Sequence, residues 1–188
     1  MRLKYIASQP KRLELNLERE ILDGLFDPFP NKGHLNMRKA TLNDVELLLE
    51  LMREFYAESN YELDRENATN AFKTILENED LGHVFIIQLE GQDVGHAVIT
   101  YKFAMEYGGM MACLDDLFVV PAFRNRGLST IALEEIRRFC LEHQIHAMTV
   151  EVAFDNAPAQ KVYRRVGFTE LENRQLLGLS LANPSHVI

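Results

Sequence analysis

The sequence predicts a mixed α/β (α+β) fold, in which one central, mostly antiparallel sheet is flanked by helices. Two observations lead to this fold class. In the middle of the chain, strand-like runs follow one another across tight-turn signals, which is typical of antiparallel hairpins. After them, a strand-like run leads into a long helical pattern and then into another strand, as in units that join parallel strands. With 188 residues, the chain is long enough for one domain with a full core.

The first part of the chain predicts an extension, a strand and two helices. We assign residues 1–34 to an N-terminal extension, which is either an arm packed on the core or on a partner subunit, or a partly disordered leader. Residues 35–188 form the predicted domain. A first strand is expected at residues 35–39. Thr41 then caps a helical apolar pattern, and a second helix is expected over residues 66–77.

Three strands are expected in the middle of the chain. The runs 84–89 and 94–103 flank Gly91-Gln92-Asp93, a short turn signal that predicts a hairpin. Gly108-Gly109 predicts a second turn, and a strand over residues 110–120 follows it.

The last part of the chain predicts helices that alternate with strands. A long helix is expected over residues 127–143, because its apolar residues lie on one face, and a strand is expected over residues 147–154. Another helix begins after Asn156. Two final apolar runs, 168–171 and 176–181, predict a hairpin that closes the domain.

Composition narrows the class of protein. The net charge of −8 argues against a nucleic-acid partner, which requires a basic surface, and is compatible with a cationic substrate. No apolar run approaches the roughly 20 residues that span a membrane, and the first residues turn polar too soon for a secretory signal. Cys113 and Cys140 lie in apolar surroundings and are expected to be free, buried thiols. A cytoplasmic location is the resulting expectation.

A strand-to-helix loop at residues 119–130 has the features of a phosphate site. A β-branched run ends at Pro121, two arginines and Gly127 follow, and a long helical pattern begins. The first turn of a helix leaves backbone N–H groups without partners, and the helix dipole makes this end slightly positive. Arg124 and Arg126 add guanidinium groups that suit phosphate oxygens. The alternative is an ordinary strand–helix connection with solvated arginines.

A second motif lies about thirty residues further along the chain. Asn156 is a good N-cap, Pro158 lies in the first turn of the helix, and Gly167 fits a left-handed stop at its end. Ala159 and Tyr163 lie on one helical face.

Taken together, the two segments resemble the GNAT superfamily of acetyl-CoA-dependent N-acetyltransferases. Arg124 and Gly127 match that family's pyrophosphate loop, and Ser129 takes a position that is usually glycine or alanine. The second segment is similar to the family's asparagine–alanine–tyrosine–glycine–phenylalanine helix, matched by Asn156, Ala159, Tyr163, Gly167 and Phe168. The resemblance extends more loosely over residues 35–182.

The resemblance implies a site for acetyl-CoA. In the family, the two strands equivalent to residues 110–120 and 147–154 splay apart, and the pantetheine arm of the cofactor enters the gap. The pyrophosphate is held by backbone N–H groups of the loop, and the pantetheine amides by the strand before it. Asn156 is either a helix cap alone or also a cofactor contact. The residues expected to bind acetyl-CoA are Leu117, Phe118, Val119, Arg124, Asn125, Arg126, Gly127, Leu128, Ser129, Thr130, Asn156 and Tyr163.

Four side chains are candidates for the chemistry. By resemblance, Tyr163 is the acid that protonates the leaving thiolate; the alternative is a core tyrosine. Asp115 and Asp116 interrupt an apolar strand, and because neighbouring strand residues point to opposite faces, we expect them in different environments. The pair is similar to one in spermidine/spermine N-acetyltransferases, which implies that Asp115 is the base and Asp116 holds the cation. A salt bridge to a neighbouring helix is the alternative. Glu151 is another base candidate.

The acceptor is expected to be a primary amine, and by preference a small cationic one, attacked directly in a ternary complex. Tyr56, Tyr61 and Glu106 are candidate acceptor contacts on loops. No metal site is expected. Two alternative functions stay open. The protein is either an N-acetyltransferase of proteins or peptides, or a non-catalytic acyl-CoA-binding regulatory module. Family members commonly pair, so a homodimer is also expected.

Overall fold

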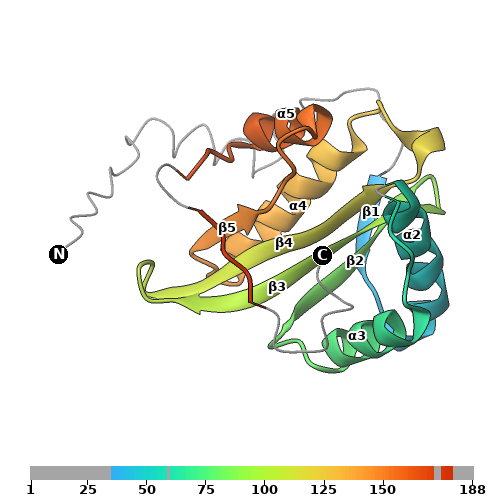
Figure 1. Cartoon of the computed structure of the whole chain (residues 1–188), viewed down its shortest axis with the longest axis horizontal. Coiled ribbons are helices and arrows are strands. Elements are labelled where there is room, and N and C mark those ends of the chain that lie inside the picture. Colours follow the sequence, from blue (N-terminus) through green and yellow to red (C-terminus); the bar gives the residue numbers. More distant parts are fainter. Residues whose placement is uncertain (1–34, 59, 172–174, 180–188) are drawn as a thin grey trace.

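A five-stranded sheet runs through the centre of the computed structural model, which describes residues 35–58, 60–171 and 175–179 (Figure 1). In spatial order its strands are β1 (Leu35–Lys39), β2 (Gly82–Leu89), β3 (Gln92–Ala104), β4 (Gly109–Val119) and β5 (Ala147–Val150). The first four strands pair antiparallel, and β5 pairs with β4 in parallel. The mixed, mostly antiparallel sheet expected from the sequence is therefore confirmed. The predicted extension, residues 1–34, lies outside the described residues.

Helices cover both faces of the sheet (Figure 1). Two short 3-10 helices, η1 (Leu42–Asp44) and η2 (Pro121–Phe123), precede α2 and α4. One face carries α2 (Val45–Glu58) and α3 (Arg65–Glu77), and the other carries α4 (Leu128–Glu142) and α5 (Ala157–Val166).

The sheet is buried on both faces in its middle, because its central strands carry continuous apolar runs there. On β2, Val84 and Ile86 pack against α2, whereas Phe85 packs in the cluster that contains Leu133 and Ile136 of α4. Side chains that alternate along one strand thus reach two separate cores.

The β2–β3 hairpin turns at Glu90 and Gly91, whose φ angles are 52° and 80°. Two successive left-handed residues make the tight turn that matches the twist of paired strands. The turn therefore begins one residue before the predicted Gly91-Gln92-Asp93, and the strands that flank it are longer than expected.

Two sequence expectations near the C-terminus are wrong. β5 ends at Val150 rather than at residue 154, and Phe154 is fully exposed. The described residues 168–171 and 175–179 form no strand, so the closing hairpin is not formed there. Leu176 and Leu177 are adjacent, which breaks the alternation that a half-buried strand needs, and both are exposed. Residues 180 and 181 lie outside the described part of the chain.

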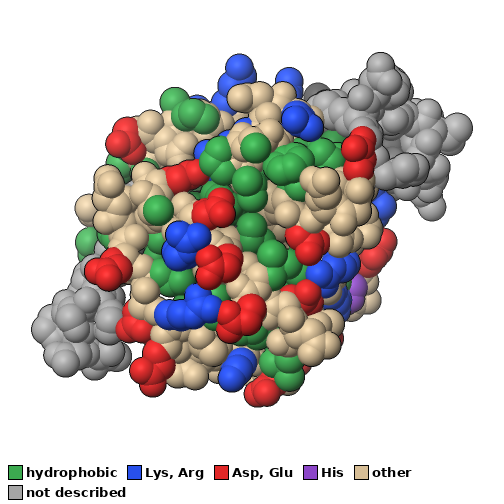
Figure 2. Space-filling view, turned by 90° about the vertical axis from the view of Figure 1, so that its right-hand side faces the viewer, with side chains coloured by type: hydrophobic (Ala, Val, Ile, Leu, Met, Phe, Trp, Pro, Cys, Tyr) green, Lys and Arg blue, Asp and Glu red, His purple; other side chains and the backbone are tan. Residues whose placement is uncertain are grey.

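Acidic and basic side chains are interspersed on the face of the molecule shown in Figure 2. Arg65 of α3 pairs with Glu46 and, at 3.1 Å, with Glu50, both on α2. Neither described cysteine forms a disulfide; Cys140 is buried as expected, whereas Cys113 is only half-buried. In the described ranges no helix combines the length and the apolar character that crossing a bilayer requires.

An ion pair at the start of α2 links β1 to the helix. Both guanidinium nitrogens of Arg38 donate to Asp44, at 2.9 and 2.7 Å, and the Thr41 N–H donates to the same carboxylate at 2.8 Å. The hydrogen bond from Arg38 above all holds the pKa of Asp44 well below its usual range. A carboxyl group with a lowered pKa stabilises the folded state above its unfolded pKa of about 4, and this contribution is lost as the pH falls below it.

We expect Arg38→Met to lower the free energy of unfolding at pH 7 by about 1–2 kcal/mol, because Asp44 then loses its main partner. Urea denaturation at pH 7 and pH 3 measures this, and the difference from the wild type should be smaller at pH 3. Arg53→Met is the matched control, since Arg53 forms an exposed pair with Glu50 on one helix and should change stability little. An equal loss at both pH values would contradict the account.

Candidate active site

The sheet opens between β4 and β5. The two strands pair only where Met111–Leu114 lies beside Ala147–Val150. Beyond Leu114, β4 continues to Val119 as a partner of β3, but β5 has already ended. The segment 115–119 thus has one edge that, within the described ranges, no strand covers. An extended ligand can add to such an edge as another strand would, and the expected contacts Leu117, Phe118 and Val119 lie on it.

The loop after β4 ends in a set of free backbone donors. Asn125 and Gly127 have φ angles of 61° and 77°, and Gly127 is the N-cap of α4. No group in the described part of the chain accepts a hydrogen bond from the backbone N–H groups of residues 126–130. Since these groups converge at the start of a helix of 15 residues, they form a site suited to a phosphate group.

The two arginines of this loop differ in what they contact. Arg124 donates to Glu58 of α2 at 2.5 Å and to the carbonyl oxygen of Val119 at 2.7 Å, and it lies over the ring of Phe118. Its side chain therefore ties the loop to α2 and β4. Arg126 is exposed, and among the described residues it contacts only the Ala122 carbonyl oxygen, at 3.4 Å, and a neighbouring aromatic ring, over which its guanidinium group lies. Arg126 is thus the arginine more available to a phosphate.

The start of α5 is held by polar side chains. Asn156 caps the helix, because its Oδ1 accepts from the Ala159 N–H at 3.1 Å. Gln160 donates to the carbonyl oxygens of Ala153 and Phe154, each at 3.0 Å, which fixes the preceding loop. The predicted left-handed stop is present at Gly167, with φ of 107°.

A β-bulge at Asp115 changes the orientation of the acidic pair. Asp116 lies opposite Val98, and Leu114 lies opposite the next residue of β3, so Asp115 is the extra residue. Before the bulge, Leu114 faces the α4 side; after it, Leu117 does. The expectation that the two carboxylates face opposite sides is therefore wrong, because the bulge turns both toward α2.

The two carboxylates have different surroundings on that face. Asp115 is an exposed residue that accepts hydrogen bonds from Thr100 and Cys113, yet partial desolvation by the surrounding protein, and then the charge of Asp116, raise its pKa. The side chain of Asp116 is only 16% exposed, and its Oδ2 lies 3.8 Å from Nε2 of His96. Asp115 is consequently the more accessible carboxylate, and its raised pKa makes it a stronger base than an ordinary aspartate, whereas Asp116 lies deeper.

The charge of these carboxylates acts on two tyrosines. Burial first, and then the charge of Asp116, raise the pKa of Tyr163. Burial and the charges of Asp116 and Asp115 likewise raise the pKa of Tyr56. Both phenols therefore stay protonated at neutral pH and can donate. Tyr61 packs edge-on against Tyr56, with 6.4 Å between ring centroids, so the two predicted acceptor contacts lie together.

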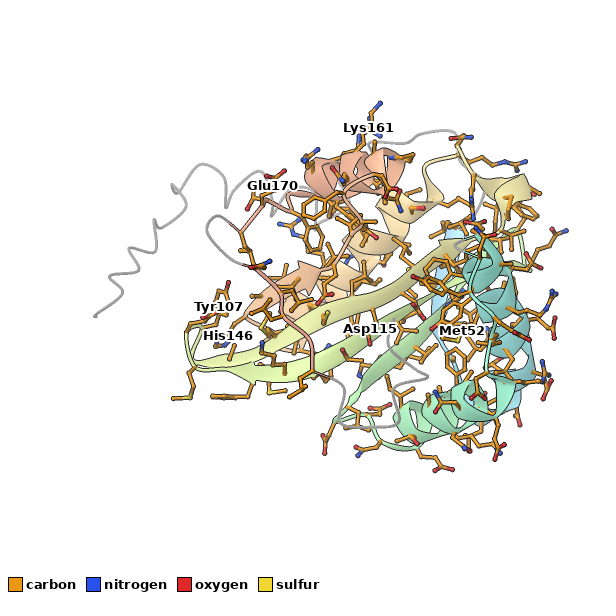
Figure 3. The ribbon with its side chains drawn as sticks, in the orientation of Figure 1. Met52, Tyr107, Asp115, His146, Lys161 and Glu170 are labelled. Atoms are coloured by element: carbon orange, nitrogen blue, oxygen red, sulfur yellow. The ribbon has the colours of Figure 1, made fainter. Side chains whose placement is uncertain are left out.

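Glu106, the third predicted acceptor contact, lies elsewhere. It is on the turn between β3 and β4, next to Tyr107, whose carbonyl oxygen contacts His146 at 2.9 Å. Figure 3 shows Tyr107 and His146 at the far end of the sheet and Asp115 in its middle. At roughly 3.3 Å per residue, the part of β4 between that turn and Asp116 is about 20 Å long. The structure thus does not bring Glu106 to the site; Glu151 lies just beyond β5 and is exposed.

A cavity of about 730 Å³ lies beside the site, between α4, β5 and α5. Its lining includes Tyr163, Cys140 and Met148, but neither aspartate of the acidic pair and none of the loop residues 124–130. The cavity therefore adjoins the open edge of β4 rather than coinciding with it. In the described residues, no group of three or more His, Cys, Asp or Glu side chains could hold a metal ion.

Two residues of β3 at the site were missed by the sequence analysis. His96 is fully buried between Phe55 and Phe118. Gly95 precedes it, and a Cβ atom there would lie 2.1 Å from the carbonyl oxygen of Phe118. The signal was present in the sequence, since a glycine and a histidine interrupt the apolar run of residues 94–99.

Comparisons with known proteins agree with this architecture. Residues 45–168, well over half of the chain, match the model of the acetyltransferase (GNAT) family. No curated protein matches the chain.

Solved structures resemble the chain over most of its length. An integron cassette protein from the mobile metagenome of Cole Harbour Salt Marsh is 39% identical, with 79% of this chain and 91% of that chain covered and a TM-score of 0.71. A predicted acetyltransferase from Clostridium acetobutylicum, solved with acetyl-CoA, is 21% identical, with 77% and 96% covered and a TM-score of 0.65. The aminoglycoside N-acetyltransferase AAC(6')-Iy, solved with CoA, is 21% identical, with 81% and 99% covered and a TM-score of 0.67. From its fold and from the family match, the chain belongs to the acetyltransferase (GNAT) family.

Proposed function

We propose that this protein transfers an acetyl group from acetyl-CoA to the primary amine of a small cationic molecule, by direct attack in a ternary complex. One observation carries the proposal. The uncovered edge of β4 runs from the free N–H groups at the start of α4 to a cluster of two carboxylates and two phenols. A donor with a phosphate at one end and a thioester at the other fits this edge, and a cationic acceptor fits the cluster.

The donor half of the site is built from backbone. N–H groups of residues 126–130 would hold the pyrophosphate, and the edge formed by Leu117 to Val119 would bind the pantetheine amides. Asn156 would contact the donor in addition to capping α5. Acetyl-CoA, when bound, supplies the acetyl group as a thioester. A backbone N–H of β4 near Leu117 can stabilise negative charge on the thioester oxygen.

We expect Arg126→Ala to weaken acetyl-CoA binding about 10-fold, because one charge-assisted hydrogen bond to phosphate is lost. Isothermal titration calorimetry at two salt concentrations measures the dissociation constant, and the salt dependence should become weaker in the variant. Arg138→Ala is the control, because Arg138 pairs with Glu135 on the exposed side of α4. If Arg126→Ala and the wild type bind acetyl-CoA with equal affinity, Arg126 does not contribute to the donor site.

The acceptor half of the site is acidic. Asp116 would hold the ammonium group of the acceptor, and Asp115 would remove its proton, directly or through a water molecule. Tyr56 and Tyr61 would line the entrance. Tyr163 would donate a proton or a hydrogen bond to the departing thiolate; a thiol pKa near 8.5 makes a hydrogen bond sufficient.

We expect Tyr163→Phe to lower kcat by about 10- to 100-fold with little change in acetyl-CoA affinity, because only the hydroxyl group is lost. Steady-state kinetics and calorimetry measure the two quantities. Tyr101→Phe is the control: Tyr101 is also half-buried, burial raises its pKa to about 12, and it packs on His83 away from the carboxylates. An unchanged kcat in Tyr163→Phe would assign Tyr163 to the core alone.

The acceptor class is tested by the release of CoA from acetyl-CoA with panels of polyamines, aminoglycosides, amino acids and peptides. Aminoglycosides are included because one structural neighbour is an aminoglycoside N-acetyltransferase. Release stimulated by small polycations supports the proposal. Release stimulated by peptides alone would favour a protein N-acetyltransferase, and acetyl-CoA binding without any stimulated release would favour a non-catalytic module.

A further inference from the structure

His96 is the one histidine among the described residues that is completely enclosed. Its side chain is 0% exposed and lies between the rings of Phe55, on α2, and Phe118, on β4, at centroid distances of 6.4 and 6.0 Å. Within the described ranges, neither of its ring nitrogens has a hydrogen-bond partner. The closest charged atom is Oδ2 of Asp116, 3.8 Å from Nε2.

An imidazole ring in this position needs an acceptor. Even in its neutral form it carries one N–H group, and a buried N–H without an acceptor is unfavourable. The surrounding elements leave little choice of partner. From α2, Phe55 offers no acceptor and Tyr56 lies toward the carboxylates; beyond Phe118, Arg124 is a donor only, and the carboxylate of Glu58 already accepts from it. On β4, Asp115 is bonded to Thr100 and Cys113, which leaves Asp116.

The distance is one that a small movement can close. A hydrogen bond from N–H to a carboxylate spans about 2.7–2.9 Å, so the carboxyl group of Asp116 has to move by about 1 Å. The aromatic rings on both sides hold the imidazole in place, whereas Asp116 is partly open to solvent and can rotate toward it.

We propose that His96 is a positioning residue for Asp116, to which it donates a hydrogen bond from Nε2. One carboxylate oxygen is then fixed against the buried ring, and the other faces the open side of the site. A carboxylate held in this way is pre-oriented for the ammonium group of the acceptor, because it does not have to be ordered when the acceptor binds. The part of the inference that concerns the acceptor rests on the proposed function; the contact itself does not.

Nuclear magnetic resonance of the ¹⁵N-labelled histidine rings tests the contact without any turnover. His96→Gln identifies the His96 signals by their loss. We expect the proton of His96 on Nε2, and we expect Asp116→Asn to shift the Nε2–H signal. Asp115→Asn is the matched control and should leave it in place. A proton on Nδ1, or a signal that Asp116→Asn does not move, would overturn the inference.

Kinetics then test the positioning role. His96→Phe keeps an aromatic ring between Phe55 and Phe118 but removes the donor, so we expect the KM for the amine to rise about 10-fold while kcat changes less. His96→Gln retains an N–H donor near the position of Nε2 and should recover part of the loss. His83→Phe is the control, because His83 is also buried but packs on Phe139 of α4, on the other face of the sheet.

The outcomes separate this inference from the proposed function. Losses of kcat and thermal stability that run in parallel, with no recovery in His96→Gln, would assign His96 to packing alone. If no amine is acetylated but the resonance of His96 responds to Asp116→Asn, the contact stands and the proposed function fails.

Discussion

Asp115→Asn is expected to lower kcat for the acceptor amine by about 100-fold or more, which is the scale of a lost general base. The structure favours Asp115 for this role because it is exposed and its pKa is raised, chiefly by partial desolvation and then by the charge of Asp116. A base acts in its deprotonated form, so kcat/KM should rise with pH through the pKa of Asp115. The variant should lose this rise.

Asp116→Asn serves as the matched comparison for that experiment. Because Asp116 lies deeper, with its side chain 16% exposed, we expect its loss to raise the KM for the amine more than it lowers kcat. Steady-state kinetics from pH 5 to pH 9 on both variants measure these effects. A large loss of kcat in Asp116→Asn, with near-normal turnover in Asp115→Asn, would reverse the two assignments.

Gly95→Ala is expected to lower the free energy of unfolding by about 3 kcal/mol. The new Cβ atom would lie 2.1 Å from the carbonyl oxygen of Phe118, which is backbone and cannot rotate away. β3 and β4 would have to separate where Gly95 lies opposite Val119, beside the buried His96. Urea denaturation followed by circular dichroism measures the loss.

Gly91→Asn is the control for this prediction. Gly91 has φ of 80°, a Cβ atom there would contact nothing within 4 Å, and asparagine tolerates the left-handed conformation better than most residues. The control should change stability little. If the unfolding midpoint of Gly95→Ala equals that of the wild type, β3 and β4 can separate at this point without loss of stability.

Local patterns predicted most of the helices and strands. The cap at Asn156 and the left-handed stop at Gly167 are properties of short segments, and they locate α5 closely. The same holds for the alternating and continuous apolar runs of β2 to β4.

Features that depend on pairing between strands could not be predicted in this way. Asp115 and Asp116 share one face only because β3 is one residue short opposite them, which no property of the dipeptide indicates. β5 ends at Val150 because its ladder with β4 ends there, although the apolar pattern continues. Glu106 was expected on a loop like Tyr56 and Tyr61, but Tyr56 lies in α2, and the length of β4 separates Glu106 from both.

The most direct test of the account is mass spectrometry of the products formed from acetyl-CoA and the amine that stimulates CoA release most strongly. Direct attack in a ternary complex predicts an acetylated amine in an amount equal to the CoA released, with no acetyl group on the protein at any time. Acetylated protein that accumulates before the amine product would contradict direct attack. CoA release without an acetylated amine would contradict the transferase function itself.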